Sequence, residues 1–238
     1  SSPDYIGHQF GVDSKEIEDT YIRLDKELAD FLKFLDKEVG EKNYTLFLTA
    51  DHAAVQVPAY LSSLKIPSGY INSVEFKQMV TDFCMNRFGS DQLIEDYSNF
   101  QLFLNKDELK RLKLDRNEVS QILVDYVLEF DWVFRVVDAH SLQNNLYKDR
   151  IMEFLKNGYN QKLSGDVLII PNPATISHSM KGTTHGSGFT YDTHVPILFY
   201  GKGVKQGKSS RFCYSTLCDT WCFQNENPHI IFFSFFGR

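Results

Sequence analysis

The sequence predicts an α/β protein with a largely parallel sheet. A long amphipathic helix is expected over residues 16–39, and an apolar run at residues 44–50 follows it directly. Two more apolar runs, at residues 166–171 and 195–201, read as further strands. A helix followed at once by a buried strand is typical of layered α/β folds, in which ligands gather beyond the carboxyl ends of strands.

The composition is that of an ordinary globular protein. The chain has 238 residues, of which 42% are hydrophobic and 24% are charged, enough for one sizeable core or for a domain with an insertion. A net charge of -6 gives no indication of nucleic acid or an anionic membrane as partner. No apolar run of about 18 residues occurs, so no transmembrane span is expected. The chain opens on Ser1 rather than Met, and we expect any targeting segment to lie upstream.

The long helix has clear boundary signals. Ser14 is suited to the N-cap and Gly40 to the C-cap. Between them, apolar residues recur every three or four positions, as a helix with one buried face requires. These residues are Ile17, Tyr21, Leu24, Leu28, Phe31, Leu35 and Val39. The strand "YTLFLTA" then follows, and it ends at Asp51 and His52.

The middle of the chain, about residues 70–165, is expected to be an inserted α+β cap. It contains a predicted strand at 99–105, a helix at 117–129 and a shorter helix at 147–157. The alternative is that this block is ordinary core. In either case we expect residues 1–208 to form one portion of a domain, with residues 209–238 as a separate tail.

The last 30 residues have a different texture. From about Ser209 the chain becomes rich in phenylalanine and holds Cys213, Cys218 and Cys222, without helical or strand periodicity. Three closely spaced cysteines cannot all pair with one another, so an accidental or structural origin is favoured over a metal knuckle. A shift of reading frame near Ser209 is the hypothesis that accounts for this tail.

Three groups of Asp and His residues could carry chemistry. Both residue types are ligands that zinc accepts. Each group adjoins glycine or turn-prone residues, so we expect each to lie on a loop at a strand end. The groups are Asp4 with His8, Asp51 with His52, and His185, with His194 as its rival.

Each of these residues also has an ordinary interpretation. Asp4 could cap a turn, Asp51 could cap a helix that begins near Ala53, and His185 could fit a tight loop beside Gly186. Taken together, the three groups indicate a metal site whose reaction is undecided. Other chemistries lack support, because the Gly-x-Ser-x-Gly elbow, the P-loop and the dinucleotide fingerprint are all missing from the sequence.

Two further histidines are weaker candidates. His178, in "ATISHSM", lies near the third group in sequence, so a substrate-side or supporting role is open. His140, in "VVDAHSL", is expected at the end of a helix.

Three motifs together resemble the alkaline phosphatase superfamily. They are "SSPDYIGHQFG", "FLTADHAAVQVPAYL" and "KGTTHGSGFTYDTHVPILFYGKGV", in the order found in that family. The chain is most similar to the phosphate-irrepressible bacterial alkaline phosphatases, relatives of the type I phosphodiesterases and nucleotide pyrophosphatases. The resemblance covers about residues 1–208 and implies a doubly wound sheet with helices on both faces, incomplete here because the N-terminal strands are missing.

The resemblance also implies a set of ligands for two zinc ions. Asp4, His8 and His185 would bind one zinc, and Asp51 and His52 would supply part of the shell of the other. His185 is preferred over His194 because the family ligand stands in a His-Gly pair, which His185-Gly186 matches. His194 would then be a supporting residue.

The rest of the implied machinery is not found in this chain. In the family, a Thr or Ser nucleophile forms a phospho-enzyme, and an Asn, a Lys and an Arg grip the phosphate, all in the preceding half. We therefore expect hydrolysis of small phosphate esters by the complete enzyme, export to the periplasm or medium, and little activity of this chain alone. A phosphodiesterase, or a truncated product without turnover, is the alternative.

Overall fold

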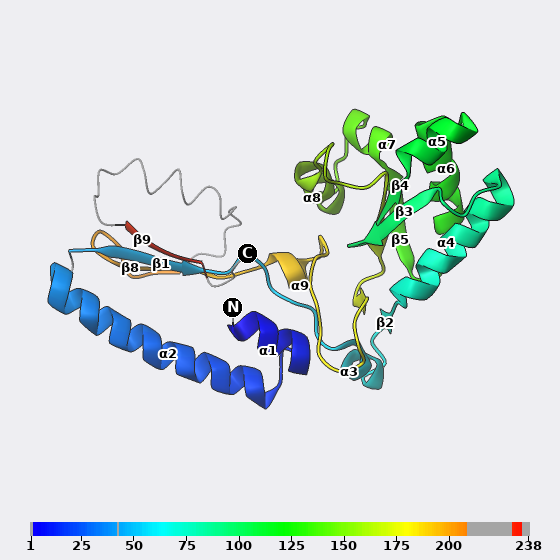
Figure 1. The fold of residues 1–238 in the computed structure, drawn as a ribbon. Helices are drawn as coiled ribbons and strands as arrows, with labels where there is room; N and C mark the ends of the chain where they lie inside the picture. The colour runs from blue at the N-terminus through cyan, green and yellow to red at the C-terminus, as the bar shows by residue number, and fades with distance from the viewer. Residues whose placement is uncertain (1, 42, 209–229, 235–238) are drawn as a thin grey trace. The chain divides into compact units, whose positions relative to one another are not determined.

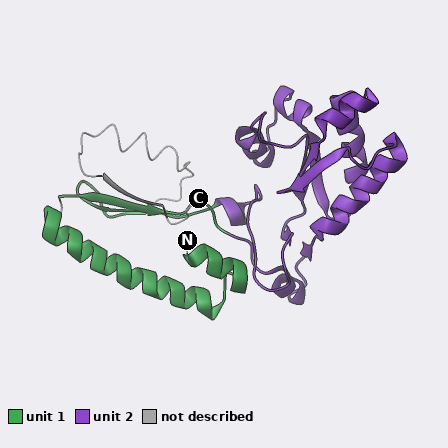
Figure 2. Ribbon diagram, viewed as in Figure 1, with its two compact units in different colours: residues 1–53, 194–238 green, residues 54–193 purple. Residues whose placement is uncertain are grey.

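The computed structural model describes residues 2–41 and 43–208, together with the backbone of residues 230–234 (Figure 1). The chain divides into two compact units (Figure 2). Unit 1 comprises residues 1–53 and 194–238, and unit 2 comprises residues 54–193. The three clustered cysteines and the proposed frameshift point lie outside the described residues.

Unit 1 begins with the helices α1 (Ser2–Phe10) and α2 (Lys15–Leu35), and a π-helical turn, η1 (Asp36–Gly40), extends α2. The predicted N-cap is confirmed, because Ser14 Oγ accepts a hydrogen bond from the Ile17 amide at 3.2 Å. The turn ends at Gly40, whose φ of 97° suits glycine. The helix expected over residues 16–39 is therefore present, with a change of winding in its last turn.

The sheet of unit 1 has β1 (Thr45–Thr49) at its centre. The strand β8 (Ile197–Gly201) pairs with it antiparallel, and β9 (Ile230–Ser234) pairs with it parallel. α2 contributes Leu35 to a small core that also contains Tyr44 and Leu46. Tyr44 donates a hydrogen bond to Asp36 at 2.9 Å, and its burial raises the pKa of the phenol. These contacts fix the strand that ends at Asp51 and His52.

Unit 2 is built around a four-stranded antiparallel sheet in the order β3-β4-β6-β5. Five helices accompany it. The strands are β3 (Ile94–Ser98), β4 (Gln101–Leu104), β6 (Val167–Pro171) and β5 (Val133–Asp138). The helices are α4 (Ser73–Phe88), α5 (Lys106–Leu112), α6 (Arg116–Val127), α7 (Ala139–Asn144) and α8 (Arg150–Gly158). A smaller region holds α3 (Pro58–Ser63), β2 (Gly69–Tyr70), β7 (Thr175–Ile176) and α9 (Thr190–Thr193).

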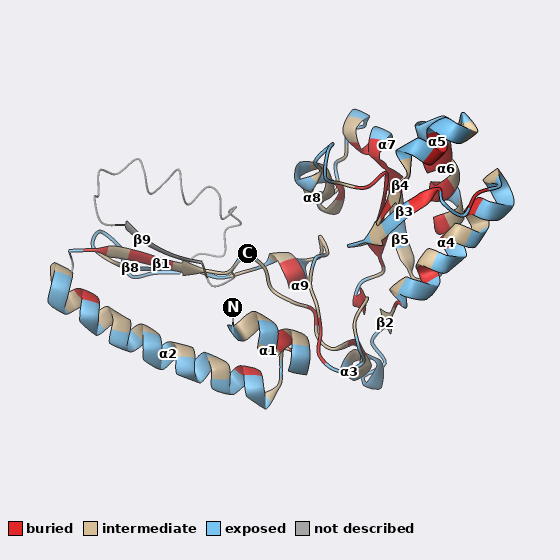
Figure 3. Ribbon diagram, viewed as in Figure 1, coloured by how far each residue is buried: buried red, intermediate tan, exposed pale blue. Residues whose placement is uncertain are grey.

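β6 is buried along its whole length because helices cover both faces of the sheet (Figure 3). Side chains alternate between faces along a strand. Val167 and Ile169 belong to the core shared with α4, α5 and α6, whereas Leu168 and Ile170 belong to the core that includes α7 and α8. The strand expected at residues 166–171 is confirmed, and so is the α/β class. Where the sequence predicted a largely parallel sheet, the sheet of unit 1 is mixed and the four-stranded sheet of unit 2 is antiparallel.

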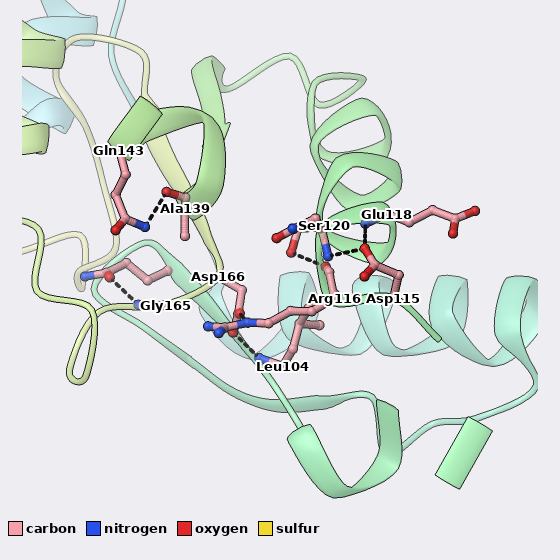
Figure 4. Close-up of polar contacts among 11 residues, drawn as sticks. Leu104, Asp115, Arg116, Glu118, Ser120, Ala139, Gln143, Gly165 and Asp166 are labelled. Atoms are coloured by element: carbon pink, nitrogen blue, oxygen red, sulfur yellow. Dashed lines mark hydrogen bonds and ion pairs between the residues drawn. The ribbon is translucent and has the colours of Figure 1, made fainter. Parts of the chain in front are cut away.

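Asp166 joins several elements of unit 2 (Figure 4). Its side chain is only 5% exposed, and its Oδ2 accepts a hydrogen bond from the Leu104 amide at 2.8 Å. The same carboxylate pairs with Arg116 at the start of α6. The backbone carbonyl of Asp166 accepts a hydrogen bond from the Ala139 amide at 2.8 Å. A buried carboxylate with these partners holds β4, β6, α6 and α7 in register.

The other expected elements of the middle block are also present. The strand predicted at 99–105 is β4, and the helices predicted at 117–129 and 147–157 are α6 and α8. All of residues 70–165 lie inside unit 2, and their status as an inserted cap stays a prediction. None of the helices in the described part of the chain has the length and apolar character needed to cross a membrane.

Candidate metal centre

Asp4 and His8 lie on one helix and not on a loop, so the expectation of a loop for this pair is wrong. They are four residues apart on α1, which places both side chains on the same face. Pro3 and Asp4 suit the first turn of a helix. The helix is closed by a hydrogen bond from the Gly11 amide to the Gly7 carbonyl at 2.9 Å, with Gly11 at a φ of 93°.

The helix brings the two side chains into contact. Nε2 of His8 lies 3.2 Å from Oδ1 of Asp4, and the side chains are 31% and 23% exposed. Two atoms that share a tetrahedral zinc ion at ~2.0–2.2 Å stand about 3.3–3.6 Å apart. The observed separation is close to that span, and both groups stay accessible to an ion from solvent.

Asp51 and His52 follow the last residue of β1, as the sequence predicts. Oδ1 of Asp51 accepts a hydrogen bond from the His52 amide at 3.0 Å, which fixes the carboxylate at the strand end. The alternative role of Asp51 as a helix cap is wrong, because the next helix of the structure, α3, begins at Pro58. The loop position lets these neighbours converge, whereas within a strand they would point to opposite faces.

The ring of His52 is oriented by a backbone group. Its Nδ1 lies 2.9 Å from the carbonyl oxygen of Ala53, which can only accept a hydrogen bond. Nδ1 therefore carries the proton, and in the neutral ring Nε2 keeps its lone pair. A histidine that binds a metal through one nitrogen commonly donates the other N–H to a carbonyl in this way.

The two pairs meet within unit 1. Nε2 of His52 lies 3.9 Å from Oδ1 of Asp4 and 3.8 Å from Oδ1 of Asp51. Two carboxylates and the lone pair of a neutral imidazole repel one another at this range unless a cation or proton lies among them. The donor set of oxygen and nitrogen atoms suits zinc. The separations of 3.8 and 3.9 Å are slightly longer than the edge of a zinc tetrahedron.

His185 lies in unit 2, in the loop between β7 and α9. Its loop position agrees with the prediction. The following Gly186 has a φ of 117°, which is the tight-loop geometry that its pairing with glycine suggested. The ring is partly buried.

The remaining candidates differ in their surroundings. His194 is exposed and precedes β8 in unit 1. His178 is partly buried, and its Nδ1 lies 3.2 Å from the Ser179 carbonyl oxygen. His140 is the second residue of α7, which confirms the expected helix-terminal position. Asp192 is a buried acid seven residues after His185, and it was not singled out because a lone Asp in "FTYDTH" has no distinctive local pattern.

Known proteins provide an independent comparison. The family model for type I phosphodiesterase / nucleotide pyrophosphatase matches residues 1–195. The chain is 40% identical over 91% of its length to a protein named calcium-transporting ATPase from Myroides odoratus. It is 37% identical over 89% of its length to alkaline phosphatase PafA from Elizabethkingia meningoseptica, and 39% identical over 90% to alkaline phosphatase PhoV from Synechococcus elongatus.

A solved structure shares the fold. The crystal structure of wild-type alkaline phosphatase PafA superposes with a TM-score of 0.82 at 37% identity, covering 88% of this chain and 40% of the other. The chain spans about 40% of the length of these relatives. The resemblance drawn from the three motifs is thus confirmed, and the chain belongs to the type I phosphodiesterase/nucleotide pyrophosphatase family.

Proposed function

We propose that this chain is part of a zinc-dependent phosphate monoester hydrolase of the alkaline phosphatase type. One observation carries the proposal: Asp4, His8, Asp51 and His52, from a helix and a distant strand end, meet at 3.2–3.9 Å. Relatives named alkaline phosphatases, PafA and PhoV, support the reaction class.

The side chains divide into two groups of ligands. Asp4, His8 and His185 would hold one zinc, and Asp51 and His52 would hold part of the shell of a second. When bound, such a pair of ions neutralises the charge that develops on the attacking and leaving oxygens of a phosphoryl group. The two carboxylates offset the positive charge of the ions, and the hydrogen bond from His52 to Ala53 keeps the Nε2 lone pair available.

The remaining machinery is proposed to lie outside this chain. A Thr or Ser nucleophile would form the phospho-enzyme, and other groups would grip the phosphate. The substrates would be small phosphate esters, in the periplasm or outside the cell. The share of the relatives' length that the chain covers, about 40%, agrees with a divided active site.

Activity of the isolated chain tests this division. We expect background hydrolysis of p-nitrophenyl phosphate by the 238-residue chain with added zinc. Fusion to the preceding half of a relative such as PafA should restore turnover, and His8→Ala should abolish it. His140→Ala, which alters an exposed histidine of α7, is the matched control. Robust activity of the isolated chain that is lost in His185→Ala would contradict the proposal.

Phosphodiester hydrolysis is the second candidate, because the matching family includes type I phosphodiesterases. The restored protein should be assayed with p-nitrophenyl phosphate and with bis-p-nitrophenyl phosphate. A higher kcat/KM for the monoester supports the proposal, and a higher value for the diester favours this alternative.

A further inference from the structure

A buried acid holds the chain just after His185. Asp192 is 3% exposed, and its Oδ2 accepts two hydrogen bonds from Ser187. The Ser187 amide donates at 2.8 Å and the Ser187 hydroxyl at 2.6 Å. When one carboxylate accepts charge-assisted hydrogen bonds from both the amide and the hydroxyl of a serine, that serine is restricted to a single conformation.

Ser187 in turn closes the loop onto α9. Its hydroxyl oxygen accepts a hydrogen bond from the Phe189 amide at 3.3 Å, and the Phe189 carbonyl accepts from the Asp192 amide at 3.0 Å. The hydrogen-bonded turn formed by these bonds begins two residues after His185. Gly188, within this hydrogen-bonded turn, lies against α8, where a Cβ would meet Ile151 Cγ2 at 3.1 Å.

The chain before His185 is anchored as well. Thr183 is 1% exposed, and its hydroxyl donates to the Val55 carbonyl at 2.6 Å. The Tyr191 hydroxyl accepts a hydrogen bond from the Ala174 amide at 3.0 Å, which ties α9 to the segment entering β7. His185 therefore lies between Thr183, which is buried, and Ser187, which the buried Asp192 holds, and Gly186 after it has a positive φ of 117°.

We propose that Asp192 is a positioning residue for His185 and acts through Ser187. The inference rests on the proposed function in so far as His185 is a zinc ligand. The buried carboxylate of Asp192 fixes Ser187, which lies two residues after His185 in the same loop. A loop that carries a metal ligand must be kept in one conformation if the metal is to bind without an ordering cost. A merely structural acid would stabilise unit 2 without affecting the ring of His185.

The first test needs no metal. In the metal-free 238-residue chain, the side-chain ¹⁵N–¹H signals of His185, assigned by their loss in His185→Gln, should form a single set. In Asp192→Ala we expect broadened or multiple signals, because the loop samples several conformations. Asp192→Asn keeps an oxygen acceptor for Ser187 and should restore the single set. An unchanged ring spectrum in Asp192→Ala would overturn the inference.

The second test uses Zn²⁺ alone, measured by competition with a chromophoric chelator. Loss of a group that orients a ligand weakens metal binding by about 10–100-fold, so Asp192→Ala should weaken affinity by at least about tenfold. Asp166→Asn is the matched control, since it alters an equally buried acid of unit 2 and should change affinity less than about twofold. Equal losses in both variants would reveal a global effect and overturn the inference.

A variant that leaves Asp192 in place guards against unfolding. Ser187→Ala removes the hydroxyl and keeps the amide donor. It should broaden the signals of the His185 ring and weaken Zn²⁺ binding, both to a smaller extent than Asp192→Ala does. If Ser187→Ala changes neither the ring signals nor the Zn²⁺ affinity, the result counts against the inference. Unchanged Zn²⁺ affinity in His185→Ala would contradict the proposed function. That outcome is separate from the inference on Asp192, which the metal-free spectrum of the His185 ring decides.

Discussion

Oδ1 of Asp4 lies 3.2 Å from Nε2 of His8, one turn further along the same helix. The same carboxylate oxygen lies 3.9 Å from Nε2 of His52, which follows the central strand of unit 1. A single oxygen thus links the two pairs of candidate ligands. Its position between two imidazoles is why we propose that the two pairs belong to one metal centre.

Removing His8 should weaken zinc binding without harming the fold. His8→Ala deletes a proposed ligand from α1 at a partly exposed position, and alanine favours the helix more than histidine does. We expect Zn²⁺ affinity of the chain to fall by more than about tenfold in a chelator competition. His140→Ala should match the wild type, and the same affinity in both variants would contradict the assigned role of His8.

Glu108 should make unit 2 sensitive to acid. Its side chain is buried, and Arg111 donates two hydrogen bonds of 2.7 Å to it while Ser90 donates a third. Arg111 first and Ser90 second lower the pKa of this carboxyl from 4.5 to about 2. Because the folded pKa lies below the unfolded one, the stabilisation is present above pH 4.5 and is lost as the pH falls toward 2.

Urea unfolding at several pH values checks this linkage. The signal is the fluorescence of Trp132 in unit 2, in a Trp221→Phe background that removes the second tryptophan. Glu108→Gln should be less stable than its parent at pH 7, and the gap should shrink between pH 5 and pH 3. A gap that stays constant over this range would contradict a carboxyl titrating below its ordinary pKa.

The core of unit 2 should be sensitive to a cavity at Leu123. This side chain is 0% exposed in α6, whereas Leu128 at the end of the same helix is 50% exposed. Leu123→Ala should lower the free energy of unfolding by about 2–5 kcal/mol. The matched Leu128→Ala should cost less than about 1 kcal/mol. Similar losses in the two variants would mean that Leu123 is not part of a packed core.

Gly165 should not tolerate a side chain, for a reason of space. A Cβ at this position would lie 2.7 Å from the backbone oxygen of Leu102. Gly165→Ala should therefore destabilise unit 2 by about 1–3 kcal/mol. Gly158, the last residue of α8, has open space around a Cβ, and Gly158→Ala should be neutral or stabilising. The Trp132 unfolding assay measures both, and a stable Gly165→Ala protein would contradict the close approach at Leu102.

Elements with strong local patterns could be predicted from the sequence. Ser14 caps the start of the long helix as predicted, because its capping chemistry is local. Gly40 is the last residue of the π-helical turn, and the C-cap is the next residue, Glu41. β6 was recognisable as a strand from the run "DVLIIP". The direction of the strands beside β6 could not be predicted, because an apolar run carries no information on whether the adjacent strand is parallel or antiparallel.

The candidate site shows the same limit. The identities of Asp4, His8, Asp51 and His52 were predictable, since Asp and His near strand ends suggest a metal. The helical setting of Asp4 and His8 was not, because α1 has only nine residues with a glycine inside, and such a short helix depends on tertiary packing. The meeting of His52 with Asp4 likewise joins segments far apart in the chain, which no local pattern specifies.

The most direct test of the metal centre is a zinc-edge anomalous difference map from crystals of this chain grown with Zn²⁺. We expect one peak within about 2.0–2.2 Å of the facing atoms of Asp4 and His8, and a second beside Asp51 and His52. Well-ordered density for these four side chains without an anomalous peak among them would contradict the assignment.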